Sequence, residues 1–424
     1  MKILLIGKHS RTGGAAIASR RLMEALKSRQ VDVNMLVQEG GNEIEGIYST
    51  TNGPVKRWMN FWRFILERLV FLRQESSKSI RFLYSLANTG ESIIRNQYVK
   101  EAQLIHLHWI NGGFLSLRSL RQLLKSGKPV VWTFHDMWPF TGGCHYALEC
   151  KAYKRECGQC PYLKKPSEKD LSNRIWKKKE KLFRNTQVTV ITPSNWLNEC
   201  VKTSSLLHDW KAVTIHNPID HDVFKPIDRD TACHNLGLDP SKLYILFGAA
   251  TLTNMLKGFS YFLEAVQNLA RTPDEFRDVE ILLFGKAKED IAALLPLITR
   301  NMAIVQTTST LVELYNAAHL FVIPSVQDNL PNTILESMFC GTPVVGFRTG
   351  GIPEMIDHKV NGYLADLKSS SDLAEGIRWI LKTESYDRLS QQTRDVAVKR
   401  YSQERSVQMH IDLYERLIEK AKQS

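Results

Sequence analysis

The sequence has no long uninterrupted apolar run. Across its 424 residues, no stretch reaches the roughly 18 uncharged apolar residues that a helix needs to cross a bilayer. The first apolar run, residues 3–6, is far shorter than the core of a secretory signal, and polar Lys8 and His9 follow it closely. Both absences lead us to expect a cytoplasmic protein.

Low-complexity segments and short repeats are also absent. Hydrophobic residues make up 43% and charged residues 24% of the chain, values that exclude a wholly disordered chain and a fibrous repeat. A chain of this length is too long for one hydrophobic core and suits two domains of about 200 residues each. Size and composition therefore predict a globular protein with two domains.

Acidic residues are fewer than basic ones, 44 against 56, which leaves a formal charge of +12. The excess is local, because residues 56–100 hold nine Lys or Arg and three acids, and residues 151–181 hold eleven and four. The rest of the chain is close to neutral, and no nucleic-acid-binding motif accompanies the charge. The two segments therefore predict patches for phosphates or anionic lipid, and no nucleic-acid partner.

Cysteine is sparse, with seven in the chain, but four of them follow the spacing C-x5-C-x6-C-x2-C inside a Cys-rich insertion at 140–181. This C-x2-C pair with two thiols upstream fits a structural zinc, and a reducing cytoplasm argues against disulfides. No common zinc finger has this spacing, so free thiols and a redox-sensitive pair stay open as alternatives. The candidate ligands are Cys144, Cys150, Cys157 and Cys160.

Short runs rich in Val, Ile and Leu alternate with longer helix-like segments. Runs that are apolar on both faces are typical of parallel strands covered by helices. The pattern occurs twice, which predicts two doubly wound α/β domains. The first series of strands is expected at 2–7, 33–38, 104–109, 129–135, 188–193 and 212–217. The second is expected at 244–249, 279–285, 303–307, 320–324 and 343–347.

Prolines and acids interrupt the periodicity between the two series. We place an interdomain linker at 218–240, between an N-terminal domain, 1–217, and a C-terminal domain, 241–400. A helix is expected at the end of the chain, 401–424. Ligands of open parallel sheets bind beyond the carboxyl ends of the strands, so two such domains are expected to face each other across a cleft that holds the site.

The first predicted strand is followed by Gly13 and Gly14, which open a helix. Small residues let backbone amides approach an anion, and the helix N-terminus adds partial positive charge. The pair does not match G-x-G-x-x-G, and a plain tight turn explains it as well as a ligand contact does. Gly13 and Gly14 are therefore candidate donor-binding residues.

Two carboxylates flank the end of the predicted strand at 320–324. A loop presents Asp328, and a helix beginning near Pro331 carries Glu336. Carboxylates accept paired hydrogen bonds from vicinal diols, and charge-assisted hydrogen bonds are strong. Either acid alone would more often be a helix cap or a surface group. Together they indicate a site for sugar or ribose hydroxyls.

The block around these acids resembles the E-x7-E signature of retaining family-four glycosyltransferases. It continues with G-x-P-V-V from Gly341 and with Gly350-Gly351-Ile-Pro-Glu354, as in that family. The resemblance implies a GT-B fold, in which Glu336 holds the donor ribose, Asp328 contacts the donor sugar, and the amides of Gly350 and Gly351 face sugar or diphosphate. The chain departs from the signature at Asp328, where the family usually has Glu.

Two further positions match the same family. Lys257, in a segment that ends in Lys-Gly, would neutralise the charge that develops on the departing diphosphate. The family commonly adds an Arg a few positions earlier, and none lies between Gly248 and Lys257. His135, at a strand end, would contact a sugar hydroxyl or the acceptor side. The resemblance also implies catalysis with no cofactor, because the leaving phosphate takes the proton of the acceptor.

Aromatic and basic residues mix between 56 and 100. Trp58, Phe61, Trp62 and Ile65 recur at helical spacing, with arginines between them. A basic amphipathic helix with Trp and Phe suits the surface of an anionic leaflet. Packing against the sheet of its own domain is an equally good explanation.

Together, these residues and the resemblance predict a retaining glycosyltransferase of hexosyl type that acts in surface polysaccharide synthesis. Its partners would be a nucleotide-sugar donor and a glycan or lipid-linked glycan acceptor at the inner face of the plasma membrane. A non-catalytic nucleotide- or glycan-binding scaffold with the GT-B fold is the alternative. A sugar-nucleotide epimerase of related shape fits the two acids less well.

Overall fold

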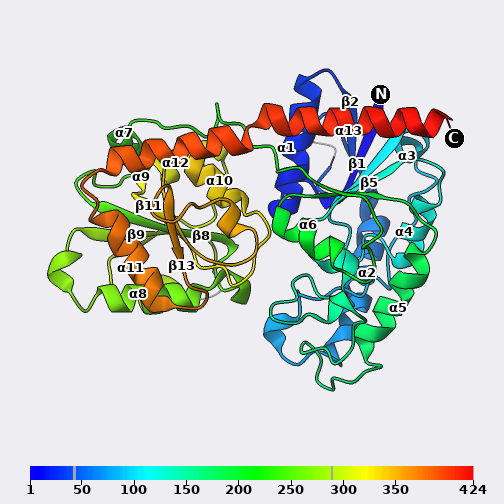
Figure 1. Ribbon diagram of the computed structural model, residues 1–424, viewed down its shortest axis with the longest axis horizontal. Coiled ribbons are helices and arrows are strands. Elements are labelled where there is room, and N and C mark those ends of the chain that lie inside the picture. The colour runs from blue at the N-terminus through cyan, green and yellow to red at the C-terminus, as the bar shows by residue number, and fades with distance from the viewer. Residues whose placement is uncertain (42–43, 288–289, 424) are drawn as a thin grey trace. The chain divides into compact units, whose positions relative to one another are not determined.

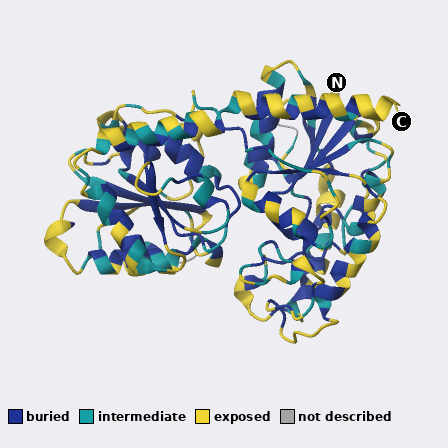
Figure 2. Cartoon of the chain, in the orientation of Figure 1, coloured by how far each residue is buried: buried dark blue, intermediate teal, exposed yellow. Residues whose placement is uncertain are grey.

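The computed structural model describes residues 1–41, 44–287 and 290–423, which form two compact units (Figure 1). Unit 1 comprises Met1–Pro218 and Glu404–Ser424, and unit 2 comprises Ile219–Gln403. Each unit is built on a parallel sheet whose central strands are buried (Figure 2). The prediction of two doubly wound α/β domains is confirmed.

The sheet of unit 1 has the order β3-β2-β1-β4-β5-β6-β7, with every neighbouring pair parallel. Alternate residues of its central strand β1 enter different hydrophobic clusters: Leu4 and Ile6 pack on one side, and Ile3 and Leu5 on the other. Apolar residues on both faces of each strand are what a sheet covered by helices on both sides requires. The strands are β1 (Lys2–His9), β2 (Asp32–Glu39), β3 (Ile47–Ser49), β4 (Leu104–Leu107), β5 (Val130–Thr133), β6 (Thr189–Thr192) and β7 (Ala212–Thr214).

Several helices of unit 1 begin where a polar side chain accepts one of the first backbone N–H groups. Ser116, Asp170 and Ser194 cap α4, α5 and α6 in this way. The chain returns to unit 1 at its end, where α13 places Val407 and Tyr414 in the same cluster as β1. The helices are α1 (Gly14–Ser28), α2 (Gly53–Leu72), α3 (Gln97–Glu101), α4 (Leu117–Leu124), α5 (Leu171–Phe183), α6 (Asn195–Lys202) and α13 (Gln403–Gln423).

The sheet of unit 2 has the order β10-β9-β8-β11-β12-β13, again parallel throughout. Its strands are β8 (Leu243–Thr251), β9 (Val279–Lys286), β10 (Thr299–Asn301), β11 (Leu320–Ile323), β12 (Val344–Phe347) and β13 (Gly362–Ala365). Its helices are α7 (Arg229–Asn235), α8 (Phe259–Leu269), α9 (Thr308–Ala317), α10 (Asn332–Phe339), α11 (Ser370–Leu381) and α12 (Tyr386–Tyr401).

Two predictions about the chain's organisation need correction. The proposed linker, 218–240, is part of unit 2 from residue 219 onward, since it contains α7 and buries Phe224 and Cys233 in the core of that unit. The strand expected at 303–307 lies earlier, at β10, because Ala303 has a left-handed backbone with φ 55° and ends the extended run. The helix expected at 401–424 is α13, and residue 424 lies outside the described residues.

The sequence pattern also missed the two edge strands β3 and β13. Neither contains a run rich in Val, Ile and Leu, since β3 reads Ile-Tyr-Ser and β13 reads Gly-Tyr-Leu-Ala, so the pattern that revealed the central strands is missing there. In the part of the chain that the structure describes, no helix is both long enough and apolar enough to cross a membrane.

Candidate functional site

Unit 2 gathers polar side chains at the carboxyl ends of β8 and β11, which are neighbours in its sheet. Lys257 ends a short 3-10 helix after β8, and Asp328 lies in the loop between β11 and α10. The Lys257 Nζ donates to Asp328 Oδ2 at 2.6 Å. The Asp328 side chain is 12% exposed and that of Lys257 is 33% exposed, so a solute can reach this ion pair.

The carboxylate of Asp328 is held by its own loop as well. Its Oδ1 accepts from the backbone N–H of Asn329 at 3.0 Å, and its Oδ2 accepts from Ser325 Oγ at 3.4 Å. The Ser325 side chain is fully buried. These contacts fix the direction of the carboxylate before any ligand arrives, which is the preorganisation that an electrostatic site needs.

Backbone contacts hold three loops together around this ion pair. Gly258 and Gly350 both have left-handed backbones, with φ of 69° and 57°. A Cβ at Gly258 would lie 1.9 Å from the carbonyl oxygen of Pro324, and one at Gly350 would lie 1.9 Å from that of Asp328. The N–H of Gly351 donates to the same Asp328 carbonyl at 3.1 Å. Only glycine permits approaches this close.

Glu336 lies on α10, whose start at Asn332 agrees with the helix predicted near Pro331. Its side chain is buried, and Tyr315 on α9 donates its hydroxyl to Glu336 Oε2 at 3.1 Å. Burial and then Glu336 raise the pKa of the neighbouring Cys340 thiol. Nothing in the sequence pointed to Tyr315, because it follows Val312 at helical spacing and so has the pattern of an ordinary core residue.

The structure therefore brings together Lys257, Asp328, Gly350 and Gly351, four of the residues predicted for the donor side. Glu336 follows on the helix that the Asp328 loop leads into. The arrangement offers a cation, a carboxylate with fixed direction and the backbone amides of a tight turn within one loop cluster. Such a set can bind a ligand that carries both phosphate and hydroxyl groups.

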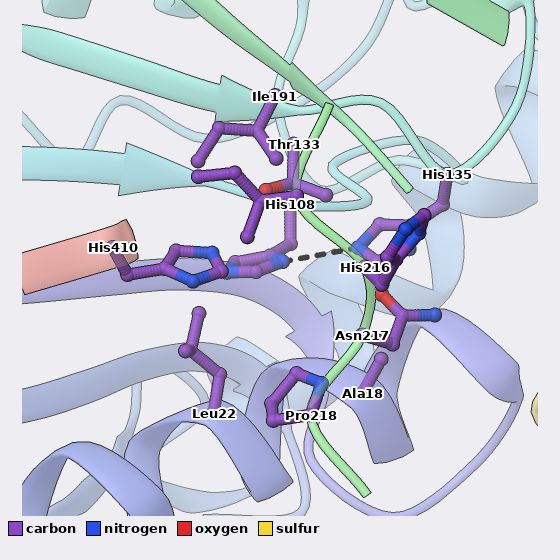
Figure 3. A pocket seen from close by; sticks show the side chains of 11 residues that line it. Ala18, Leu22, His108, Thr133, His135, Ile191, His216, Asn217, Pro218 and His410 are labelled. Atoms are coloured by element: carbon purple, nitrogen blue, oxygen red, sulfur yellow. Dashed lines mark hydrogen bonds between the residues drawn. The ribbon is translucent and has the colours of Figure 1, made fainter. Parts of the chain in front are cut away.

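Unit 1 holds a cluster of histidines beside its own strand ends (Figure 3). His135, which follows β5, is hydrogen-bonded through Nε2 to His108 Nδ1 at 3.0 Å. His106 on β4 bonds to Thr133 Oγ1 at 2.7 Å and to the hydroxyl of Tyr414 on α13 at 2.6 Å. The final helix of the chain thus supports a cluster that starts on β4 and β5.

The histidines surround a small cavity in unit 1. It leaves about 10 Å³ for the centre of a water molecule, enough for roughly one water. Figure 3 shows the imidazoles of His108, His135, His216 and His410 turned toward it, with Asn217 at its edge. His135 was expected as a single residue at a strand end, whereas the structure makes it one member of a network.

Burial keeps four of the imidazoles, those of His106, His108, His135 and His410, neutral at pH 7. It lowers the pKa of His135 and of His410 to about 4 each. The pKa values of His106 and His108 are lowered well below the ordinary value by burial and then by the neighbouring histidines. At neutral pH these four imidazoles can therefore donate and accept hydrogen bonds, but they supply no positive charge.

Gly13 and Gly14 lie at the start of α1, directly after β1. Gly13 has φ 93°, and among the described residues no side chain caps this helix. A Cβ at Gly13 would meet nothing within 4 Å, so the backbone conformation alone requires glycine there. Neither glycine lines the histidine cavity, and their contact with a donor stays a prediction.

The four clustered cysteines are all free thiols. Burial raises the pKa values of Cys144, Cys157 and Cys160 to about 12 each, and the thiols also act on one another. Within residues 1–41, 44–287 and 290–423, no three or more His, Cys, Asp or Glu side chains are arranged to hold a metal ion. The structural zinc expected at these four cysteines, Cys150 included, therefore stays a prediction.

Two family models match the chain, one in each unit. The model of Glycosyltransferase Family 4 covers residues 12–223. The model described as Glycosyl transferases group 1 covers residues 242–383, which include Lys257, Asp328, Glu336, Gly350 and Gly351. The first match spans half of the chain.

Curated relatives carry glycosyl-transfer names. The chain is 28% identical over 303 residues to the D-inositol 3-phosphate glycosyltransferase of Pseudarthrobacter chlorophenolicus, covering 69% of this chain and 66% of that protein. It is 26% identical over 208 residues to the N-acetyl-alpha-D-glucosaminyl L-malate synthase of Bacillus anthracis, covering 47% and 52%. The chain thus spans less than two thirds of the length of these relatives.

Solved structures match along almost the whole chain. Sucrose-phosphate synthase from Thermosynechococcus elongatus superposes with a TM-score of 0.71 at 19% identity, covering 99% of this chain and 100% of that one. Anabaena Alr3699/HepE in complex with UDP-glucose gives 0.65 at 16% identity, covering 98% and 99%. These similarities establish the GT-B fold of two Rossmann-like domains.

Proposed function

The chain belongs to glycosyltransferase family 4, and from that premise we propose that it is a retaining glycosyltransferase that uses a nucleoside diphosphate sugar. The observation that carries the proposal is the Lys257–Asp328 pair, held at 2.6 Å between the loops that follow β8 and β11. One member suits a phosphate and the other suits sugar hydroxyls. The family models supply the reaction class, and this pair supplies the chemistry.

In the proposed reaction, Lys257 meets the diphosphate of the donor. As the bond between sugar and phosphate breaks, negative charge grows on the leaving diphosphate, and a fixed cation stabilises that charge more than it stabilises the ground state. The chain supplies this cation itself, so the proposal needs no cofactor. The N–H of Gly351 already donates to the Asp328 carbonyl, so the N–H of Gly350 is the second donor that we assign to the diphosphate or the sugar.

Asp328 is assigned to the donor sugar and Glu336 to the ribose. The Oδ1 of Asp328 is fixed by Asn329, so its direction is set by the loop and not by the ligand. Tyr315 donates to Oε2 of Glu336 and so orients the carboxylate that we assign to a ribose hydroxyl. An Anabaena structure with the same fold is described as holding UDP-glucose, so UDP is the first nucleotide to test.

His135 is assigned to the acceptor or to a sugar hydroxyl. Its pKa of about 4 keeps the imidazole neutral at pH 7, so it would orient a hydroxyl by hydrogen bonding and not act as a cationic acid. The leaving phosphate then takes the proton of the acceptor on the same face of the sugar. Configuration is retained in this scheme without a carboxylate nucleophile.

The proposed acceptor is a lipid-linked glycan in surface polysaccharide synthesis, taken up at the inner face of the plasma membrane. The basic aromatic segment at 56–100 supports that choice, because it suits an anionic membrane surface. The names of two curated relatives instead contain inositol phosphate and malate. Transfer from a labelled donor to lipid-linked oligosaccharide, D-inositol 3-phosphate or L-malate separates these acceptors.

The donor site is tested by thermal shift of the full chain with UDP, GDP, CMP and dTDP, because a ligand that binds only the folded state raises the melting midpoint. The exposed Glu384 of the same unit offers a matched control. We expect one nucleotide to stabilise the wild type and Glu384→Ala but not Glu336→Ala. No response to any nucleotide, together with no donor hydrolysis, would leave a non-catalytic scaffold as the better description.

A further inference from the structure

Helix α2 (Gly53–Leu72) is packed with its polar side chains inward. Its buried residues are Asn60, Glu67, Arg68 and Phe71. Their spacings of seven, one and three positions place them on one face of a helix with 3.6 residues per turn. An ordinary surface helix buries an apolar stripe and exposes charge. The opposite arrangement here means that α2 joins unit 1 by hydrogen bonds and leaves its apolar stripe outside.

The inward face is anchored at several points. Glu67 Oε1 accepts from the backbone N–H groups of Leu86 and Ala87 at 2.8 and 3.1 Å. Arg68 donates to the carbonyl oxygens of Arg81 and Tyr84 at 2.6 and 2.7 Å. A rotation of the helix that buried its apolar stripe would break all of these bonds and expose two buried charges. The orientation is therefore fixed by the fold.

The outward face is large and aromatic. Trp58 is 63% exposed, Phe61 57% and Val55 69%, far above what side chains of this kind show in a packed core. Singly exposed apolar residues are common, but a contiguous stripe along a helix marks an interaction surface. We call the following set the outer face: Val55, Trp58, Met59, Phe61, Trp62, Leu66, Leu69, Val70 and Phe82.

The charges beside the outer face have one sign. The only acids between Gly53 and Phe82 are Glu67 and Glu75. Both are buried, and they lie within ion-pair distance of Arg68 and Arg81 respectively. The exposed charges of this segment are the cations Lys56, Arg57, Arg73 and Lys78.

We propose that the outer face docks on an anionic lipid bilayer, with α2 parallel to the surface. The aromatic and aliphatic side chains would enter the boundary between headgroups and acyl chains, and the cations would contact lipid phosphates. A second copy of the chain fits less well, because it would oppose one cationic surface to another. This inference does not rest on glycosyl transfer, since it concerns a surface that holds none of the assigned donor residues.

The test is flotation of the full chain with vesicles of phosphatidylcholine alone and with about 30% phosphatidylglycerol, at low salt and at about 0.5 M NaCl, where surface charge is largely screened. We expect strong binding only to the anionic vesicles at low salt. Trp58→Ser/Trp62→Ser should lower the partition coefficient at least tenfold, given the apolar area removed. Lys56→Gln/Arg57→Gln should lower it about thirtyfold, because each cation near the surface contributes about 1 kcal/mol.

Matched controls are available in unit 2, where Ile298 and Ile304 are 62% and 60% exposed. Ile298→Ser/Ile304→Ser should bind vesicles as the wild type does, and all three variants should melt close to the wild type, since the changed side chains are exposed. Equal binding of wild type and Trp58→Ser/Trp62→Ser would overturn the proposal. So would a dimer in sedimentation that dissociates in this variant, because the face would then be an interface between copies. Nucleotide thermal shifts are independent of either result.

Discussion

The loop cluster of unit 2 and the histidine cluster of unit 1 both lie where parallel strands end, yet they differ in charge and exposure. Unit 2 presents an ion pair, with Lys257 33% exposed and Asp328 12% exposed. Unit 1 presents imidazoles around a cavity with room for roughly one water, and burial keeps those of His108, His135 and His410 neutral. The strand ends of the two sheets therefore differ in electrostatic character, charged in unit 2 and neutral in unit 1.

The difference indicates how the two sites divide the proposed reaction. Breaking a bond to a diphosphate develops charge, which a fixed cation such as Lys257 stabilises. Orienting a neutral hydroxyl needs hydrogen bonds and no net charge, which neutral imidazoles provide. The comparison therefore predicts that variants in unit 2 mainly change turnover, whereas variants in the histidine cluster change acceptor use and the pH dependence of stability.

The largest effect is expected from Lys257→Met. Loss of the cation should lower kcat about 100- to 1,000-fold, the range seen when one transition-state donor is removed, while Lys257→Arg should retain much of the activity. Steady-state transfer or donor hydrolysis measures this, with thermal melting as the control for folding. A kcat for Lys257→Met within a few-fold of the wild type would remove the main difference between the two sites.

The pH dependence of stability should be steeper in unit 1. His106, His108 and His410 are buried, and their pKa values in the folded state lie below the unfolded value of about 6.5. Below pH 6.5 the unfolded chain binds more protons, so the free energy of unfolding falls, by up to about 1.4 kcal/mol per pH unit for each histidine. The loss continues to about pH 4 for His410. Above pH 7 these residues add no slope.

Urea unfolding between pH 7.5 and 5 checks this expectation, with the protease susceptibility of each unit as the readout. His106→Asn should reduce the number of protons taken up on unfolding by about one. The control is His208→Asn at an exposed position, which should leave that number unchanged. Unit 2 contains His319, and burial lowers the pKa of this residue to about 3. The stability of unit 2 should therefore also depend on pH, but less steeply. Identical slopes for both units would contradict the assigned difference in burial.

The fold was largely predictable from the sequence, because its signal is repeated in every strand. Runs such as 104–109 and 320–324 are apolar on both faces, and each corresponds to a central strand, β4 or β11. The edge strands β3 and β13 were not predictable, since neither contains a run rich in Val, Ile and Leu. The linker was misplaced because prolines such as Pro226 interrupt the periodicity without ending the packed core.

The motif identified the donor residues, but it did not predict the contacts between them. No spacing indicates that Lys257 reaches Asp328 across 71 positions, because that contact depends on the neighbouring places of β8 and β11 in the sheet. The histidine network was missed for the same reason, since it combines β4, β5 and the distant α13. The outward turn of α2 was left open, because its helical period fits burial of either face.

A smaller effect is expected from substitutions at two left-handed glycines of unit 2. Gly350→Ala would force a Cβ within 1.9 Å of the Asp328 carbonyl, whereas Gly237→Ala, at φ 66°, would meet nothing within 4 Å. Gly237→Ala should cost about 1 kcal/mol of unfolding free energy through backbone strain alone. Gly350→Ala should cost roughly 2 to 3 kcal/mol or more, because overpacking adds to that strain. Only Gly350→Ala should also weaken nucleotide binding, and equal losses in both would contradict the role of this turn.

The smallest effect is expected at the cysteine cluster of unit 1. Free thiols with pKa values of about 12, as at Cys157 and Cys160, contain very little thiolate at pH 7.5, so labelling by a disulfide reagent should be slow in the folded chain and fast after unfolding. Cys157→Ser should leave turnover unchanged and lower stability only by the weak contact of Cys157 Sγ with the N–H of Gly142. Elemental analysis of protein expressed with added zinc decides between the two interpretations of the cluster. About one zinc per chain in the wild type, lost in Cys157→Ser together with stability, would establish the structural zinc that the spacing predicts, because metal binding contributes directly to folding free energy.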